Sequence, residues 1–140
     1  MPPIVLFAFA GEIVIALALI GASVLAARHR GTNHHWLMLP IFGVDLVVFK
    51  TIMYVRAFSG AFGSFPWTGT AIFPHMVLSW LWVIAGALAI GLAFRFRVVR
   101  SGRMFMPPKG RIHRVAGGTA ITFWYISFIV GLLVFWQVYV

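Results

Sequence analysis

Four long runs of apolar residues, separated by shorter polar or mixed segments, dominate the chain. They cover approximately residues 4–27, 36–57, 70–94 and 115–139. Each run contains the roughly 20 apolar residues that a helix needs to cross a bilayer. Backbone polar groups in lipid must be satisfied within the protein, so we expect helices rather than open strands. The pattern predicts an all-α integral membrane protein, with a single transmembrane domain over residues 1–140.

The composition is that of a membrane protein rather than a soluble domain. Of the 140 residues, 62% are hydrophobic and 9% are charged, whereas a soluble domain is about half apolar and about a quarter charged. The chain has no cysteine, which excludes disulfides, thiolate metal sites, thiol nucleophiles and covalently attached c-type haem. The first apolar run is too long for a signal peptide and contains Glu12, so we expect a retained spanning helix.

Basic residues crowd into the first and third connections, which lie on one side of an up-down four-helix bundle. These connections hold Arg28, Arg30, Arg95, Arg97, Arg100, Arg103, Lys109, Arg111 and Arg114. The other side has only Arg56, with Lys50 embedded above it. The positive-inside rule therefore predicts that both termini are extracytoplasmic, in the cytoplasmic membrane of a bacterium or archaeon. It also explains the positive charge without a nucleic-acid partner, which would need an exposed basic surface on a soluble fold.

A polar stripe follows the second predicted helix. At about 100° per residue, the side chains within roughly 40° of one another are His34, Met38, Asp45, Ile52 and Arg56. Asp45, near mid-membrane, is the most costly residue of the chain to bury. It lies about 140° around the helix from Lys50, so the two are not expected to pair within it. A protonated Asp45 bonded to a neighbouring helix is one interpretation, and a ligand, proton relay or partner contact is the other.

His113 opens the fourth predicted helix, and nearly the same face carries Gly117, Ala120, Trp124 and Gly131. Small residues there either let a neighbouring helix approach or leave a slot for a planar ring. His113 and His34 (or His35) enter from the same side on different helices. Two neutral imidazoles could ligate haem b axially, with Met38 and Trp124 as further contacts, or could contribute to a copper site. Ordinary interfacial histidine is the alternative.

Three ionisable residues fall in the outer half of the predicted bundle: Glu12, Lys50 and His75. His75 lies roughly 8 Å inside the third helix at 1.5 Å per residue. Ionisable groups at such depth are costly unless paired or hydrated, so each is a candidate for function. They are predicted either to form one polar cluster or to separate, with Lys50 reaching outward and Glu12 contacting a partner subunit.

Familiar catalytic signatures are missing from the sequence, so we assign no catalytic residue and do not expect a self-contained enzyme. Walker A, HExxH and GxSxG motifs are not found, nor are paired carboxylates at hydrolase spacing. No internal repeat is convincing, although each half has a basic loop followed by a helix that starts next to a histidine.

Short motifs from residue 34 to residue 140 occur in a characteristic order and spacing. They are His34-x-x-x-Met38, Tyr54-Val-Arg56, Phe73-Pro-His75, Arg111-Ile-His113-Arg-x-x-Gly117, Phe123-Trp124 and Gly131. The series resembles the YozB-like, or CtaM-like, family of small four-helix bacterial membrane proteins, which is linked to the maturation of haem–copper terminal oxidases.

The resemblance implies a cofactor-handling role around a terminal oxidase. The recurring histidines of the family correspond to His34, His75 and His113, which become candidate ligands of haem or copper and favour His34 over its neighbour. Buried Glu12, Asp45 and Lys50 are not part of the family pattern. Their presence leaves open that this chain has a different function from the family. The favoured function is an accessory or assembly protein of the oxidase. The two alternatives are a b-type cytochrome that transfers electrons and a non-catalytic structural subunit of a larger membrane complex.

Overall fold

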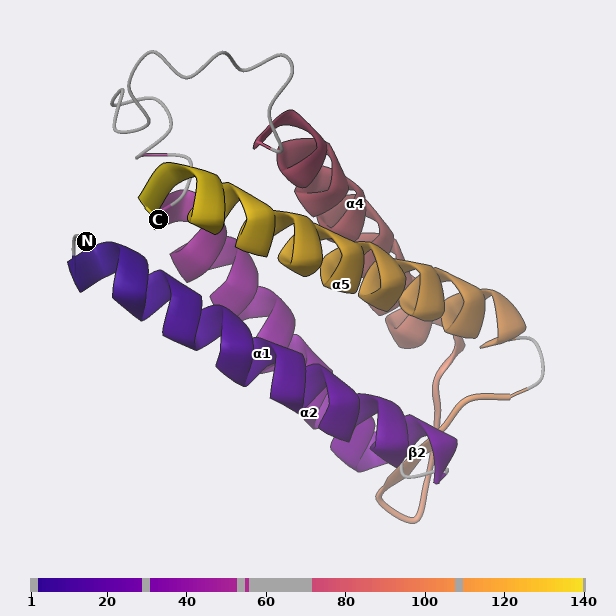
Figure 1. Cartoon of the computed structure of the whole chain (residues 1–140). Helices are drawn as coiled ribbons and strands as arrows, with labels where there is room; N and C mark the ends of the chain where they lie inside the picture. Colours follow the sequence, from indigo (N-terminus) through magenta and orange to yellow (C-terminus); the bar gives the residue numbers. More distant parts are fainter. Residues whose placement is uncertain (1–2, 29–30, 53–54, 56–71, 108–109, 140) are drawn as a thin grey trace.

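Helices make up almost all of the chain that the structure describes, which confirms the all-α prediction (Figure 1). The computed structural model describes residues 3–28, 31–52, 55, 72–107 and 110–139. Its long helices are α1 (Pro3–Ala27), α2 (Gly31–Val44), α4 (Ile72–Phe96) and α5 (Arg111–Tyr139), and α2 continues into one turn of π-helix, η1 (Asp45–Lys50). Both chain ends lie at one end of this bundle, called here the terminal end.

Three of the described helices are long and apolar enough to cross a membrane: α1, α4 and α5. Their bounds lie within four residues of the predicted runs. The second predicted run, 36–57, is less regular, because α2 begins at Gly31, contains Pro40 and changes to π geometry at Asp45. Its last part, apart from residue 55, lies outside the described residues.

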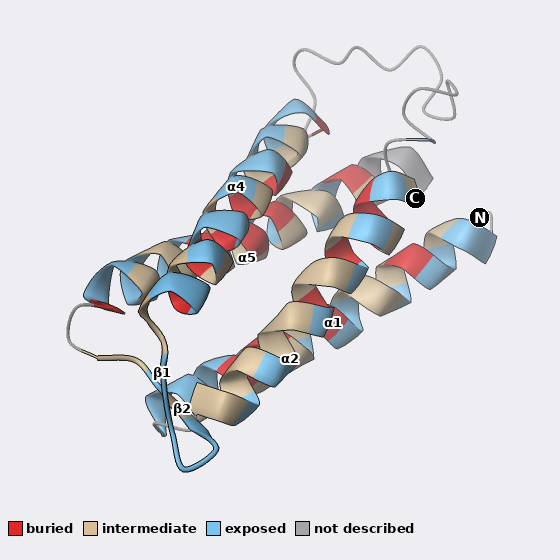
Figure 2. Cartoon of the chain, turned by 180° about the vertical axis from the view of Figure 1, so that it is seen from behind, coloured by how far each residue is buried: buried red, intermediate tan, exposed pale blue. Residues whose placement is uncertain are grey.

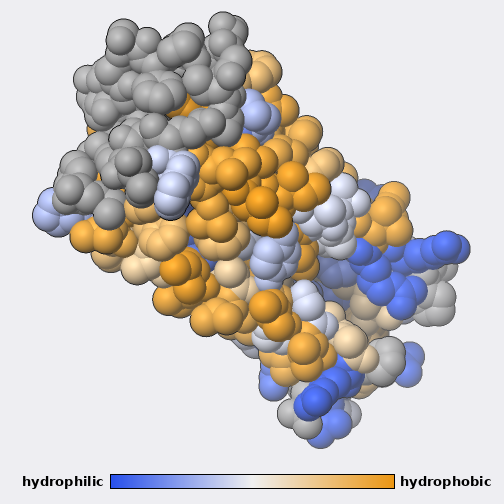
Figure 3. All heavy atoms as spheres, in the orientation of Figure 1, coloured by the Kyte–Doolittle hydropathy of each residue, from blue (hydrophilic) through white to orange (hydrophobic). Residues whose placement is uncertain are grey.

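Side chains between the helices form the core, whereas the outward faces are apolar and exposed. Buried residues lie where the helices face one another (Figure 2), and the largest fully buried side chains include Trp82, Trp124, Leu19 and Asp45. Exposed apolar residues cover the body of the bundle, and strongly hydrophilic atoms gather at the end opposite the chain termini (Figure 3). Such a surface fits a lipid bilayer.

A small β-hairpin replaces the simple basic loop that we expected between the last two helices. Strands β1 (Val98–Arg100) and β2 (Arg103–Phe105) pair antiparallel, with Val98 opposite Phe105. The two linking residues, Ser101 and Gly102, have φ of 48° and 71°. Positive φ at both positions is the requirement of a type I′ turn, which suits the twist of a two-residue hairpin. The end of the bundle that carries this turn is called here the hairpin end.

The hairpin is fixed to the start of α2. Thr32 Oγ1 accepts a hydrogen bond of 2.8 Å from the backbone N–H of Met104. Gly31 lies so close that a Cβ there would be 2.7 Å from the carbonyl oxygen of Met104. The hairpin, residues 98–105, thus contacts the other half of the bundle.

Candidate functional site

The centre of the bundle holds a buried carboxylate surrounded by hydrogen-bond donors. Asp45 is 0% exposed. Its Oδ2 accepts a 2.6 Å hydrogen bond from Trp82 Nε1 on α4, and its Oδ1 accepts a longer one of 3.4 Å from Trp124 Nε1 on α5. A bond to a neighbouring helix, which one of the two interpretations of Asp45 included, is therefore present. Its donors suit an ionised carboxylate, which can only accept.

Asp45 also pairs with Lys50, contrary to the sequence prediction. The distance from Lys50 Nζ to Asp45 Oδ1 is 3.5 Å. That prediction assumed α-helical rotation, in which residues five apart diverge. Both residues lie in η1, however, and a π-helix joins residues i and i+5 by its hydrogen bonds. The wider turn therefore brings the two side chains to the same side of the helix.

Lys50 extends the cluster to a further helix. Its Nζ lies 3.4 Å from Oε1 of Glu12 on α1, and the Lys50 side chain is 9% exposed. Lys50 is thus directed into the protein, not outward as in the alternative interpretation. Glu12, Lys50, Asp45 and the two indoles connect α1, η1, α4 and α5. Since the buried charges pair within the chain, they do not themselves require a partner subunit.

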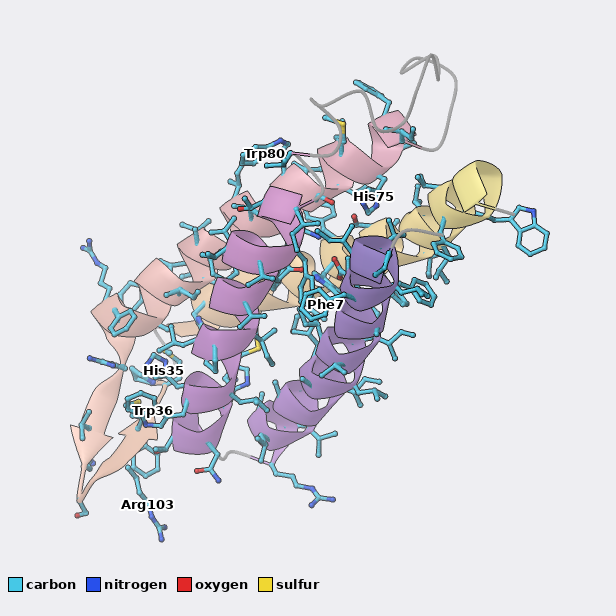
Figure 4. The ribbon with its side chains drawn as sticks, turned by 90° about the vertical axis from the view of Figure 1, so that its left-hand side faces the viewer. Phe7, His35, Trp36, His75, Trp80 and Arg103 are labelled. Atoms are coloured by element: carbon cyan, nitrogen blue, oxygen red, sulfur yellow. The ribbon has the colours of Figure 1, made fainter. Side chains whose placement is uncertain are left out.

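His75 lies near the terminal end, where it is bonded to α5. Figure 4 shows its side chain pointing from α4 into the bundle. Its Nδ1–H donates to the carbonyl oxygen of Ser127 over 2.8 Å, and the hydroxyls of Ser127 and Ser79 are 2.9 Å apart. The ring rests on Gly131, where a Cβ would lie 3.0 Å from its Cε1. The planar group next to Gly131 is therefore the imidazole of His75.

His34 and His113 make matching contacts toward the hairpin end. His34 Nδ1–H donates to the carbonyl oxygen of Ala22 on α1 over 2.9 Å, and His113 Nδ1–H donates to that of Ala89 on α4 over 2.8 Å. A carbonyl oxygen only accepts, so Nδ1 must carry the proton in each ring. The neutral imidazoles thus keep the lone pair on Nε2.

The two halves of the bundle repeat one arrangement that the sequence conceals. On α1 the buried residues Ile15, Leu19 and Ala22 have the same spacing as Trp82, Gly86 and Ala89 on α4. From His34 to buried Ile41 and Asp45, and from His113 to buried Ala120 and Trp124, the spacing is again identical. His34 and His113 therefore occupy equivalent positions in two similar helical hairpins.

The three candidate metal-binding histidines do not share a single site. Ala89, which binds His113, is separated from His75 by about 21 Å of helix at 1.5 Å per residue. Among the described residues, no three His, Asp or Glu side chains gather as ion ligands. His34 and His113 remain one candidate pair, and His75 belongs instead with Glu12 and Lys50 around a cavity.

The other candidate residues have different surroundings. Met38 packs against the hydrophobic core. Trp124 stacks on Phe128, with ring centroids 5.3 Å apart, and donates to Asp45, so its indole is engaged within the protein. His35 contacts the Phe94 ring edge-on, with ring centroids 5.2 Å apart. Arg56 lies outside the described residues.

Sequence reasoning did not identify Trp82 and Ser127 as parts of the polar centre. Trp82 counts as apolar in a hydropathy pattern, yet its buried N–H needs an acceptor. The usable signal was the presence of buried tryptophans at the level of a buried carboxylate.

Comparison of the chain with family models, curated proteins and solved structures found no match.

Proposed function

We propose that this protein is an accessory or assembly protein of a membrane haem–copper oxidase, and that His34 and His113 hold haem b between its two helical hairpins. The observation that carries the proposal is their matched geometry. Each Nδ1–H is bonded to a backbone carbonyl, which leaves Nε2 free to ligate. Metal-ligating histidines typically donate their other ring N–H in this way.

The donor set of the hairpin end fits haem better than copper. Two imidazoles from different helices can serve as the two axial ligands of a six-coordinate b-type haem. A copper site built from this chain would need further ligands, and the described residues do not gather a third His, Asp or Glu around the pair. Haem held in this way would supply one-electron chemistry or be available for transfer to an oxidase.

Two observations favour this function over its alternatives. A b-type cytochrome with two haems would need a second ligand opposite His75. Lys50, which lines the same cavity, lies in ion pairs with Glu12 and Asp45 instead. The structural-subunit alternative depended on buried charges that pair with another chain. In this protein the buried charges pair with one another, which removes that argument.

Absorption spectra of the purified protein, before and after addition of haemin, test the haem site. We expect a Soret band and, after reduction, the sharp α-band of bis-imidazole haem. H34A and H113A should each lose the reduced spectrum, whereas H75A should keep it because His75 lies at the other end of the bundle. Failure of the wild type to bind haem, or equal spectra in all three variants, would refute the site. Metal analysis of the same samples tests copper.

The oxidase role needs a separate measurement in cells. We expect loss of the gene to lower the amount of assembled, active haem–copper oxidase, and H113A to reproduce that loss while V47A, at an exposed position of the bundle, restores assembly. Oxidase that assembles normally without the protein would contradict the role even if haem binds.

We also propose that the helices cross the cytoplasmic membrane in up-down order, with both termini extracytoplasmic. Seven arginines of the described residues lie in or beside the two connections at the hairpin end, as the positive-inside rule favours for the cytoplasmic side. Because the chain lacks cysteine, S101C places a single thiol at the hairpin turn. In intact cells it should resist a membrane-impermeant maleimide and react only after the membrane is opened.

A further inference from the structure

A cavity of about 90 Å³ lies beside the buried ion pairs, toward the terminal end. Its polar groups are Glu12 on α1, Lys50 on η1, His75 on α4 and Ser127 on α5. Helix α5 also supplies much of the wall. The haem site proposed above lies at the opposite end of the bundle. The cavity therefore calls for its own explanation.

The walls of the cavity are aromatic and aliphatic. Phe9 and Phe135 stack with ring centroids 4.8 Å apart and an interplanar angle of 22°, and Phe128 stacks on Trp124. These aromatic rings line the cavity and make its walls mainly apolar. A planar apolar ring fits such walls better than a file of water molecules, which would need polar partners along its length.

The rim of the cavity faces the lipid. Ile4 on α1 and Leu132 on α5 line it and are 44% and 38% exposed on the apolar surface of the bundle. A molecule that reaches the cavity past these side chains comes from among the acyl chains, so it must be lipid-soluble.

The polar groups that the cavity offers to a ligand are mainly hydrogen-bond acceptors. The Glu12 carboxylate accepts, and the His75 Nδ1–H is already used on Ser127, which leaves Nε2 as an acceptor. The one strong donor, the Lys50 ammonium, is already shared by Glu12 and Asp45. A ligand that donates hydroxyl protons therefore suits the site better than one that only accepts.

We propose that this cavity binds the hydroxylated aromatic ring of a lipid-soluble hydroquinone. An engineered apolar cavity of roughly 150 Å³ encloses benzene, so this smaller recess of about 90 Å³, which opens toward the lipid beside Ile4 and Leu132, suits one six-membered ring whose substituents extend past the rim. The ring hydroxyls donate to Glu12 and His75, and any isoprenoid tail leaves between Ile4 and Leu132 into the lipid.

Anaerobic titration calorimetry of the full chain in lipid nanodiscs, with duroquinol and duroquinone as probes, tests the proposal. We expect duroquinol to bind about tenfold more tightly, since one hydrogen bond to a charged acceptor is worth at least that factor. A8L fills the cavity, because Ala8 is buried and lines it, and should weaken duroquinol at least about tenfold. A10L adds the same atoms to an exposed position of α1 and should not.

Equal affinities for the two probes, or equal binding in A8L and A10L, would overturn the proposal, as would a wild type that binds neither. E12Q adds a test that keeps side-chain volume, and it should abolish the preference for duroquinol over duroquinone. These readouts do not depend on haem. H34A and H113A should bind duroquinol normally, so failure of the haem site and failure of the hydroquinone site are distinguishable.

Discussion

Trp82 donates its indole N–H to the carboxylate of Asp45 across 2.6 Å, and neither side chain is more than 1% exposed. This short bond joins α4 to the π-helical turn at the middle of the bundle. Because Trp124 and Lys50 also approach the same carboxylate, both of its oxygens have donors. A buried charge is tolerated only with such compensation.

Replacement of Asp45 by asparagine should destabilise the protein strongly. D45N keeps the shape of the side chain but removes the charge that compensates Lys50, and it turns an amide donor toward other donors. Breaking a buried ion pair costs about 3 kcal/mol or more. Unfolding in mixed detergent micelles, followed by circular dichroism, measures the change. V47A, at a position 68% exposed, is the control and should change stability by less than about 0.5 kcal/mol.

The two indoles should contribute unequally. W82F removes the 2.6 Å bond and W124F the 3.4 Å one, and a hydrogen bond to a charged group contributes about 1.5–3 kcal/mol. We therefore expect W82F to lower the free energy of unfolding more than W124F, and both more than W136F, whose side chain is 65% exposed. The reverse order of the first two would mean that the stacking of Trp124 on Phe128 outweighs its hydrogen bond.

Three histidines should share one tautomer. His34, His75 and His113 each donate Nδ1–H to a backbone carbonyl of a neighbouring helix. Nitrogen-15 NMR of the haem-free protein labelled at histidine should show protonated Nδ1 and unprotonated Nε2 for all three at neutral to alkaline pH. Protonation at Nε2 in His34 or His113 would remove the basis for ligation by that nitrogen.

Glycines at close contacts should respond differently from glycines in open positions. A Cβ on Gly11 would overlap the ring of Phe49, and one on Gly131 would crowd His75. We expect G11A and G131A each to destabilise the protein by about 1–3 kcal/mol through overpacking. Gly21 has nothing within 4 Å, so G21A should be neutral or stabilise its helix by up to about 1 kcal/mol. Thermal unfolding of all three in one detergent gives the comparison.

The apolar pattern was sufficient to predict most of the helices. Length and continuity of the runs identified α1, α4 and α5 within a few residues, because the lipid requirement for internally bonded backbone allows few other structures. Helix ends in the polar connections were less visible. α5 begins at Arg111 rather than at residue 115, since hydropathy does not register a helical turn made of basic residues.

The candidate site was predictable only in part. A cluster of Glu12, Lys50 and His75 was one of two interpretations, and the three residues do lie around one cavity. Asp45 and Lys50 were not expected to pair, because an ideal α-helix rotates about 100° per residue, but one π-helical turn does not follow that rotation. The hairpin was missed because Val98–Phe105 mixes arginine with apolar residues, and its Ser-Gly turn signal lay within a run interpreted only by charge.

The π-helical turn also makes the polar centre sensitive to chain length. Such a turn accommodates one residue more than an α-helical turn, and this extra residue rotates the ammonium group of Lys50 toward the protein interior. Loss of a single codon between Asp45 and Lys50 would restore ordinary winding and expose the lysine to acyl chains. A change of one amino acid in length, with no change in hydrophobicity, would then separate the charges that hold the bundle together.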